Sequence, residues 1–430
     1  MSKAGTQYRH NHYVPKWYQK RFLRPDQSKY WYLDLKPETR VSNGVNYQRR
    51  GLMHWGPDRC FAQDDLYTVT ISGQRFTELE QYFFGEVDTE GKVAIEKLAD
   101  VEHPAHEMFP QSDLVHYLSV QKLRTPKGLV QLSHASGVRG KASVLDIVYR
   151  HQNIFCAVWS ECVWQIADAS NSPTKFIISD HPVTVYNRDC FPQSKHCIGS
   201  HDPDIRFVAS HTYFPLSLNK VLILTNLSWA RNPYQNPLNV RPNPSFHRPT
   251  VFNYLHLNTG RMLSEEEVVE INYITKRRAF RYIASAEQEW LYPERRLKSD
   301  HWRKLGDGYL FMSDPRFLTG GGEIVIGFKG GGGAAFDAYG HRPHQDEYMN
   351  AKREAQEWDA MQRFKAEWSG IVGPEYRGVP IEWQMHREGR EPIRADEFHR
   401  EELRRDEQYK NRSGEQRRRR QLKRINSGLK

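Results

Sequence analysis

Long apolar runs are absent from the sequence, and their absence excludes a membrane-spanning helix. Such a helix needs about 18 or more consecutive apolar residues, whereas the longest aliphatic runs resemble the short stretch at 221–224. The beginning of the chain also lacks the apolar core of a secretory signal peptide. We therefore expect a cytoplasmic protein without a membrane span.

Cysteine is scarce, with five residues among 430. A small and odd number argues against a disulfide framework and fits a reducing cytosol. Cys190, His196, Cys197 and His201 are potential zinc ligands, but Cys190 and Cys197 are further apart than the paired ligands of structural zinc sites. The motifs G-x-S-x-G and H-E-x-x-H and a complete Walker motif are missing too. These catalytic and nucleotide-binding motifs therefore do not identify a reaction for this sequence.

Basic residues are concentrated at the C-terminal end. The net charge is +10, and residues 409–430 contain nine Lys and Arg against one Glu, so eight of the ten charges lie there. A basic arm of this kind favours contact with nucleic acid, an acidic partner or an anionic membrane surface. The alternative is a solvated helix end. The residues expected to contact nucleic acid are Arg417, Arg418, Arg419, Arg420, Lys423 and Arg424.

Aromatic residues make up 12% of the chain, which is enough to build a core although 27% of the residues are charged. Runs typical of strands occur at 30–35, 162–167, 175–180 and 220–226. Helical patterns cover the longer ranges 76–100, 113–124, 141–159 and 264–287. Ser264 and Glu267 form a capping box that begins the last of these helices. This order predicts an α+β fold in which a small mixed sheet is flanked by helices.

The composition changes after about residue 315. Glycine becomes frequent around a short apolar run at 323–328, and from 347 the chain is highly charged with one amphipathic helical pattern. We therefore expect three parts. They are an α+β core at 1–315, a Gly-rich connector at 316–345, and a charged helical tail with a basic end at 346–430.

Two carboxylates are the first candidates for a functional site. Asp180 ends an apolar run and precedes His181 and Pro182. Strand ends are frequent places for active-site carboxylates with tuned pKa values, and the alternative is an Asp that caps a turn. Glu80 lies on a predicted acidic helix, which can bind a divalent metal or can simply form a solvated face.

Three further polar residues are candidates of the same kind. Arg124 and Gln121 end the helix predicted at 113–124, where Arg124 can bind an anion through two N–H groups or can cap carbonyl groups. His12 lies in an N-terminal segment rich in aromatic and basic residues. It can act as an acid or a metal ligand, or it can pack within an aromatic plug.

The order of these motifs resembles a family known as domain of unknown function 4238. The resemblance covers about residues 10–290 and brings no established activity. His181 stands where the family usually has Asn. The matching segments are Asn11-His12-Tyr13-Val14-Pro15, Leu79-Glu80, Gln121 with Arg124-Thr125-Pro126, Ser179-Asp180-His181-Pro182, and Pro215-Leu216-Ser217 with Asn219.

Two hypotheses about function remain open. If the five candidate residues converge in a cleft, we expect a nuclease-like phosphodiesterase in bacterial defence. Asp180 and Glu80 would then hold a divalent metal or act as base, Arg124 would neutralise the phosphate, and His12 would be acid or ligand. The second hypothesis is a non-catalytic module that binds nucleic acid or protein and uses its polar motifs structurally. Neither hypothesis specifies an oligomeric state.

Overall fold

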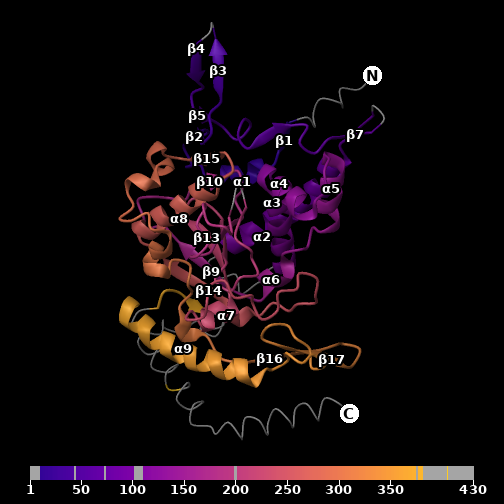
Figure 1. Cartoon of the computed structure of the whole chain (residues 1–430), viewed down its shortest axis with the longest axis vertical. Helices are drawn as coiled ribbons and strands as arrows, with labels where there is room; N and C mark the ends of the chain where they lie inside the picture. Colours follow the sequence, from indigo (N-terminus) through magenta and orange to yellow (C-terminus); the bar gives the residue numbers. More distant parts are fainter. Residues whose placement is uncertain are drawn as a thin grey trace.

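A central sheet lies between two groups of helices in the computed structural model of the chain (Figure 1). The structure describes residues 10–42, 45–71, 74–100, 110–197, 201–373, 376–380 and 404. Within these residues no helix is both long enough and apolar enough to cross a membrane.

The central sheet has six strands and is mixed. In spatial order they are β11 (Thr184–Tyr186), β12 (His211–Pro215), β13 (Lys220–Asn226), β9 (Cys162–Asp168), β14 (Leu257–Met262) and β18 (Val379–Pro380). Only β9 and β14 pair in parallel; the other neighbours are antiparallel. Nearly all residues of β9, β12 and β13 are buried, which explains their continuous apolar sequences. The predicted α+β class with a mixed sheet is confirmed.

A second, four-stranded sheet is antiparallel throughout. Its strands are β10 (Ile178–Ser179), β15 (Tyr282–Ser285), β2 (Tyr30–Asp34) and β5 (Leu52–Trp55). The strand expected at 175–180 is thus only two residues long. This sheet matters for the candidate site because Asp180 directly follows β10.

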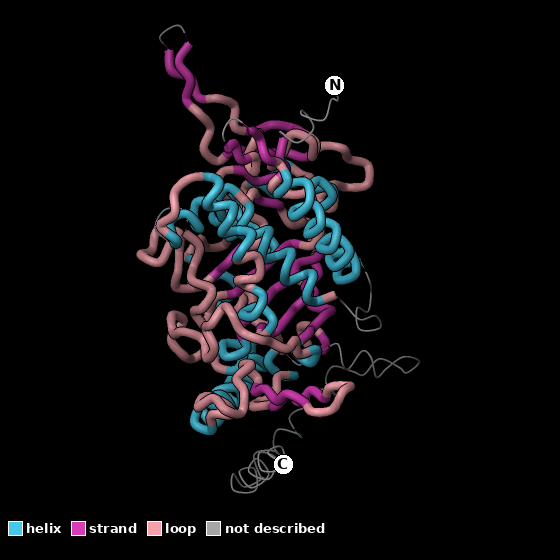
Figure 2. The backbone as a smooth tube through the Cα atoms, turned by 90° about the vertical axis from the view of Figure 1, so that its right-hand side faces the viewer, coloured by secondary structure: helices cyan, strands magenta, loops and turns pink. Residues whose placement is uncertain are grey.

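Four small antiparallel pairs complete the strands. They are β1 (His10–His12) with β6 (Ala62–Asp64), β3 (Thr39–Ser42) with β4 (Val45–Gln48), β7 (Val69–Ile71) with β8 (Gln74–Phe76), and β16 (Glu323–Gly327) with β17 (Gly333–Asp337). The β3–β4 hairpin projects from one end of the molecule (Figures 1 and 2). The pair β1–β6 fixes the N-terminal motif segment against the body.

Helices cover one side of the central sheet (Figure 2). A π-helix at Leu79–Phe84 leads directly into α2, and the helices of this layer are α2 (Gly85–Asp100), α3 (Gln111–Arg124), α4 (Pro126–Ser136), α5 (Lys141–Arg150) and α6 (Cys156–Ser160). The helix predicted at 141–159 is therefore two helices, because residues 151–155 form turns. Two short helices lie elsewhere, at α1 (Lys16–Lys20) and α7 (Leu227–Arg231).

Helices α2 and α3 approach each other closely at Gly91. A Cβ atom at this position would lie 2.2 Å from Cδ2 of Tyr117, which is too short for any side chain. Gly91 therefore stays in the middle of a helix, despite its poor helix propensity, because the packing of α3 requires it.

Helix α8 (Glu265–Arg278) begins at the predicted capping box and ends earlier than predicted. The Ser264 hydroxyl accepts the Glu267 N–H at 3.2 Å, and the Glu267 carboxylate accepts the Ser264 N–H at 2.9 Å. Ala279 leaves the helical conformation, and residues 282–285 form β15 between β10 and β2. The prediction of helix as far as 287 was wrong, because strand pairing in the second sheet overrides the local pattern.

The last described helix, α9 (Ala351–Val372), packs onto the body through an apolar face. Met361, Phe364 and Trp368 are fully buried. Met361 contacts buried residues of β9 and α7, and Phe364 and Trp368 contact Trp229 and Met312. The division into core, connector and tail stays a prediction, and most of 346–430 beyond α9 lies outside the described residues.

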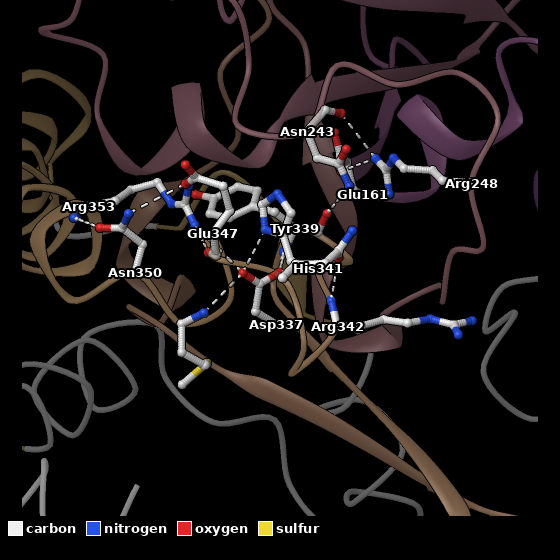
Figure 3. Close-up of polar contacts among 12 residues, drawn as sticks. Glu161, Asn243, Arg248, Asp337, Tyr339, His341, Arg342, Glu347, Asn350 and Arg353 are labelled. Atoms are coloured by element: carbon white, nitrogen blue, oxygen red, sulfur yellow. Dashed lines mark hydrogen bonds and ion pairs between the residues drawn. The ribbon is translucent and has the colours of Figure 1, made fainter. Parts of the chain in front are cut away.

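The segment before α9 is held by polar contacts (Figure 3). Asp337 accepts the backbone N–H groups of Tyr339 and His341, each at 2.9 Å, and pairs with the His341 ring at 2.8 Å. Burial by itself would raise the pKa of Asp337, but these hydrogen bonds lower it. Asn243 donates to the Tyr339 carbonyl at 3.0 Å, which joins this segment to the loop before β14.

Candidate functional site: polar clusters at the end of helix α3

The last residues of α3 contribute buried polar side chains to two separate clusters. Thr125 precedes Pro126 and is extended (φ −67°, ψ 156°), as expected for a residue before proline. Its hydroxyl accepts the Gly128 N–H at 3.1 Å and thereby caps α4. Residues three positions apart lie on the same face of a helix, so Gln121 and Arg124 face one cluster, and Lys122 and Thr125 face another.

The first cluster is centred on Arg124, which is 1% exposed. Its Nη2 donates to Asp88 Oδ1 at 2.6 Å, and its Nε donates to Gln121 Oε1 at 2.8 Å. Gln121 in turn donates to the Tyr13 carbonyl at 2.8 Å. The guanidinium is therefore fully engaged with protein groups, and the Gln121 amide ties α3 to the N-terminal motif.

Glu80 lies beside this cluster, in the π-helix that precedes α2. Burial raises its pKa to about 7; Arg124 opposes this shift and the nearby Asp88 adds to it. Its Oε2 is buried without a hydrogen-bond partner in the described part of the chain. π-Helical turns occur frequently at functional sites. Among the candidate residues, Glu80 is the one with a carboxylate oxygen left over.

The second cluster contains two lysines that share one carboxylate. Lys122 Nζ lies 2.5 Å from Asp202 Oδ2, and Lys127 pairs with Asp202 Oδ1. His181 contacts Asp202 at 3.1 Å and the Thr125 hydroxyl at 2.7 Å. All four charged or ionisable side chains are at most 7% exposed. Burial and Lys122 lower the pKa of His181 to about 3, so its ring is neutral at pH 7.

Asp180 forms a separate structural contact. Its Oδ1 accepts the Phe280 N–H at 2.8 Å, and its Oδ2 accepts the N–H groups of Arg281 and Tyr282 at 2.6 and 2.8 Å. The residue is 2% exposed. Burial raises the pKa of Asp180, and these three hydrogen bonds act in the opposite direction. The carboxylate thus anchors the link between α8 and β15 and does not lie at an open sheet edge.

His12 faces away from both clusters. Its Nε2 lies 3.1 Å from the Pro57 carbonyl, and its ring lies edge-on to His10 at 5.1 Å. Burial, His10 and Lys16 all lower the pKa of His12. The structure therefore brings Gln121, Arg124 and Glu80 together and places His12 and Asp180 elsewhere.

Lys127 and Asp202 are the cluster residues that the sequence did not single out. Lys127 follows the Arg124-Thr125-Pro126 motif directly, so its position was a usable signal. Asp202 belongs to a long irregular stretch with no periodic pattern, and nothing local marks it. The basic residues from Arg417 to Arg424 lie outside the described residues.

Asp180 and the carboxylates around Glu80 do not form a set of divalent-metal ligands among the described residues. Both oxygens of Asp180 accept backbone N–H groups, and Asp88 is held by Arg124. Within the residues that the structure describes, no group of three or more His, Cys, Asp and Glu side chains is placed to hold a metal ion. We therefore derive no chemical step through a metal.

The fold and these clusters define an α+β protein whose sequence motifs converge on the N-terminal segment and the end of α3. The chain belongs to the family described as "Protein of unknown function (DUF4238)", whose model matches residues 10–137 and 145–289. The predicted resemblance is thereby confirmed. No curated protein and no solved structure matches the chain.

Proposed function

We propose that the chain is a non-catalytic binding protein that contacts nucleic acid through its basic C-terminal end and uses its polar motifs to stabilise the fold. The observation that supports this proposal is the set of hydrogen bonds that the Asp180 carboxylate accepts. This carboxylate is buried and accepts three backbone N–H groups. A general base or a metal ligand needs a free lone pair near substrate, whereas a structural anchor needs the saturated geometry seen here.

The choice of nucleic acid rests on the distribution of charge. Residues 409–430 carry a net charge of +8, and the rest of the chain carries about +2. Eight charges at one end can neutralise several phosphates, which gives salt-dependent and sequence-independent affinity. A cytoplasmic location stays a prediction from the cysteine content.

Fluorescence anisotropy with a labelled 20-nucleotide strand tests this proposal on the full-length protein. We expect binding whose log–log salt dependence has a negative slope, with about −0.7 for each phosphate of the single strand that is neutralised. Replacing Arg417, Arg418, Arg419 and Arg420 by Ala should reduce that slope by about 3. A control with the same charge change uses the exposed residues Arg49, Arg50, Arg139 and Arg150. Equal slopes in the two variants would overturn the proposal.

A second candidate function is supported by Glu80. Its raised pKa and its unpaired Oε2 suit a general acid or base, so the nuclease-like phosphodiesterase in bacterial defence remains a hypothesis centred on this residue. Gel analysis of the labelled strand after incubation with the parent protein tests it. Cleavage that is present in the parent and lost in Glu80→Gln would replace the binding proposal by this one. An intact strand in both samples would leave the binding proposal in place.

A further inference from the structure

Two adjoining clefts lie beside the C-terminal half of α8, far from the polar clusters of the motifs in sequence. Their volumes are about 520 and 530 Å3, within the range of small-ligand sites. Tyr273, Arg277 and Asp300 line both clefts, so the two form one continuous groove. The opposite wall is the chain segment at 294–303.

Aromatic rings form the floor and the rim of this groove. Trp302 is 7% exposed and is held in place, since its Nε1 donates to the Asn187 carbonyl at 2.9 Å and Arg278 stacks on its ring. The ring of Tyr273 lies 6.4 Å from it. Phe191 at the rim is 41% exposed, so its ring is accessible to a molecule in the groove.

The lining of the groove contains more basic than acidic side chains. The basic ones are Lys276, Arg277, Lys298 and Arg303, and the acidic ones are Glu294 and Asp300. Three of the basic side chains are paired with carboxylates: Lys276 with Glu294 at 2.9 Å, Arg303 with Asp189 at 2.9 Å, and Lys298 with Glu266. Arg277 is exposed, and it has no ion pair or hydrogen bond among the described residues.

We propose that this groove binds two or three nucleotides of single-stranded nucleic acid. An accessible aromatic ring beside an unpaired guanidinium group is an arrangement that proteins use to stack a base and hold a phosphate of a single strand. Phe191 and Tyr273 would stack bases, and Arg277 would contact a phosphate. The Asp300 carboxylate, which has no partner in the described part of the chain, would accept a base amino group.

This inference rests on the proposed function, because it adds a second contact to the one made by the basic end. The basic end binds by charge alone and gives no preference for a single strand, because a duplex has the higher charge density. Stacking requires unpaired bases, so only the groove gives a preference for the single strand. The two contacts can therefore be separated in one experiment.

Anisotropy titrations with a single-stranded 20-mer and the matching duplex test the groove in the full-length protein. We expect Phe191→Ala and Arg277→Glu each to weaken single-strand binding about tenfold. Phe328→Ala, at an exposed Phe (56%) on the β16–β17 hairpin, and Arg150→Glu, at an exposed Arg on α5, are the matched controls. Figure 1 shows α5 and the β16–β17 hairpin away from α8.

Each outcome decides between the two proposals. A loss of single-strand preference in the groove variants, with controls like the parent, supports the groove. Groove variants that behave like their controls, while the fourfold arginine variant of the basic end loses affinity, overturn the groove and keep the proposed function. A parent protein that binds neither single strand nor duplex overturns both. Thermal unfolding of every variant confirms that the exposed substitutions leave the fold intact.

Discussion

At the end of α3, Arg124 and Lys122 are buried and each lies within 2.6 Å of a carboxylate oxygen. Beside α8, Arg277 is exposed and faces no carboxylate at ion-pair distance among the described residues. The first region contains three of the five candidate site residues, namely Gln121, Arg124 and Glu80. The second contains none of them. The comparison teaches that a polar motif readable in sequence can serve folding, because burying charge in a protein requires specific partners at fixed positions.

The largest effect is expected at Asp202, the carboxylate shared by two buried lysines. Asp202→Asn would leave Lys122 and Lys127 without a counter-charge and should lower the free energy of unfolding by about 3–5 kcal/mol. Urea denaturation measures this loss. Asp204→Asn is the matched control, since Asp204 is two residues away and pairs with the exposed Arg206; it should cost less than about 1 kcal/mol. Similar losses in both variants would show that the lysine cluster does not depend on Asp202.

Asp180→Asn should have the next largest effect. Both carboxylate oxygens accept backbone N–H groups. In the Asn variant an NH2 group replaces one of these oxygens, so a donor faces a donor and at least one hydrogen bond is lost. We expect a loss of about 2–3 kcal/mol in the free energy of unfolding. Asp168→Asn provides the control. Asp168 also ends a strand, and its carboxylate accepts the Ser170 N–H. An unchanged midpoint in Asp180→Asn would contradict the anchoring role.

The pH dependence of the free energy of unfolding tests the raised pKa of Glu80. The folded protein holds the pKa of Glu80 at about 7, above the value of 4.5 for an unperturbed Glu. Between pH 4.5 and 7 the folded state therefore binds more protons, and the contribution of Glu80 to stability falls as pH rises. Glu80→Gln should remove this fall, so the variant gains about 1–3 kcal/mol relative to the parent across that window.

Denaturation curves at several pH values measure this gain. Glu86→Gln, at an exposed position in the first turn of α2, is the control for the same exchange of Glu for Gln at the start of that helix. His181 acts in the opposite direction, since its pKa is lowered to about 3 and protonation below pH 6.5 opposes folding. A Glu80→Gln curve parallel to that of the parent would show that Glu80 ionises normally.

The smallest effect is expected from removal of the basic end. Residues 409–430 are polar and contain few apolar side chains, so their deletion should move the thermal midpoint by only a few degrees. Trp368→Ala is the contrasting variant. Removing this fully buried side chain of α9 should lower the free energy of unfolding by about 3–5 kcal/mol. A large loss of cooperativity in the deletion would show that the basic end packs on the body.

Local sequence patterns predicted elements well where one face or a whole strand is buried. The strands β2, β9 and β13 and the start of α8 at Ser264 are examples, because apolar runs and capping residues act over a few positions. The end of α8 was missed, since β15 is specified by β10 and β2, which are distant in sequence. The hydrogen bonds from the backbone of residues 280–282 to Asp180 were missed for the same reason, because the partners are about 100 positions apart in the sequence.

The candidate site was predictable only in part. Gln121, Arg124 and Glu80 were chosen from their places on helices, and the structure does bring them together. Their burial could not be read from sequence, because it depends on the packing of α2 against α3 at Gly91. The family usually has Asn at the position of His181, so tolerance of His181→Asn stays a prediction; the contacts of His181 with Thr125 and Asp202 are what such an Asn would have to replace.

The comparison of the two regions is tested most directly by one titration series with the single-stranded 20-mer, using Glu80→Gln and Arg277→Glu beside the parent. Glu80 represents the motif region and Arg277 represents the groove. We predict that Glu80→Gln binds with the affinity of the parent, whereas Arg277→Glu binds about tenfold more weakly and remains folded. The reverse result, with binding lost in Glu80→Gln and retained in Arg277→Glu, would contradict the account.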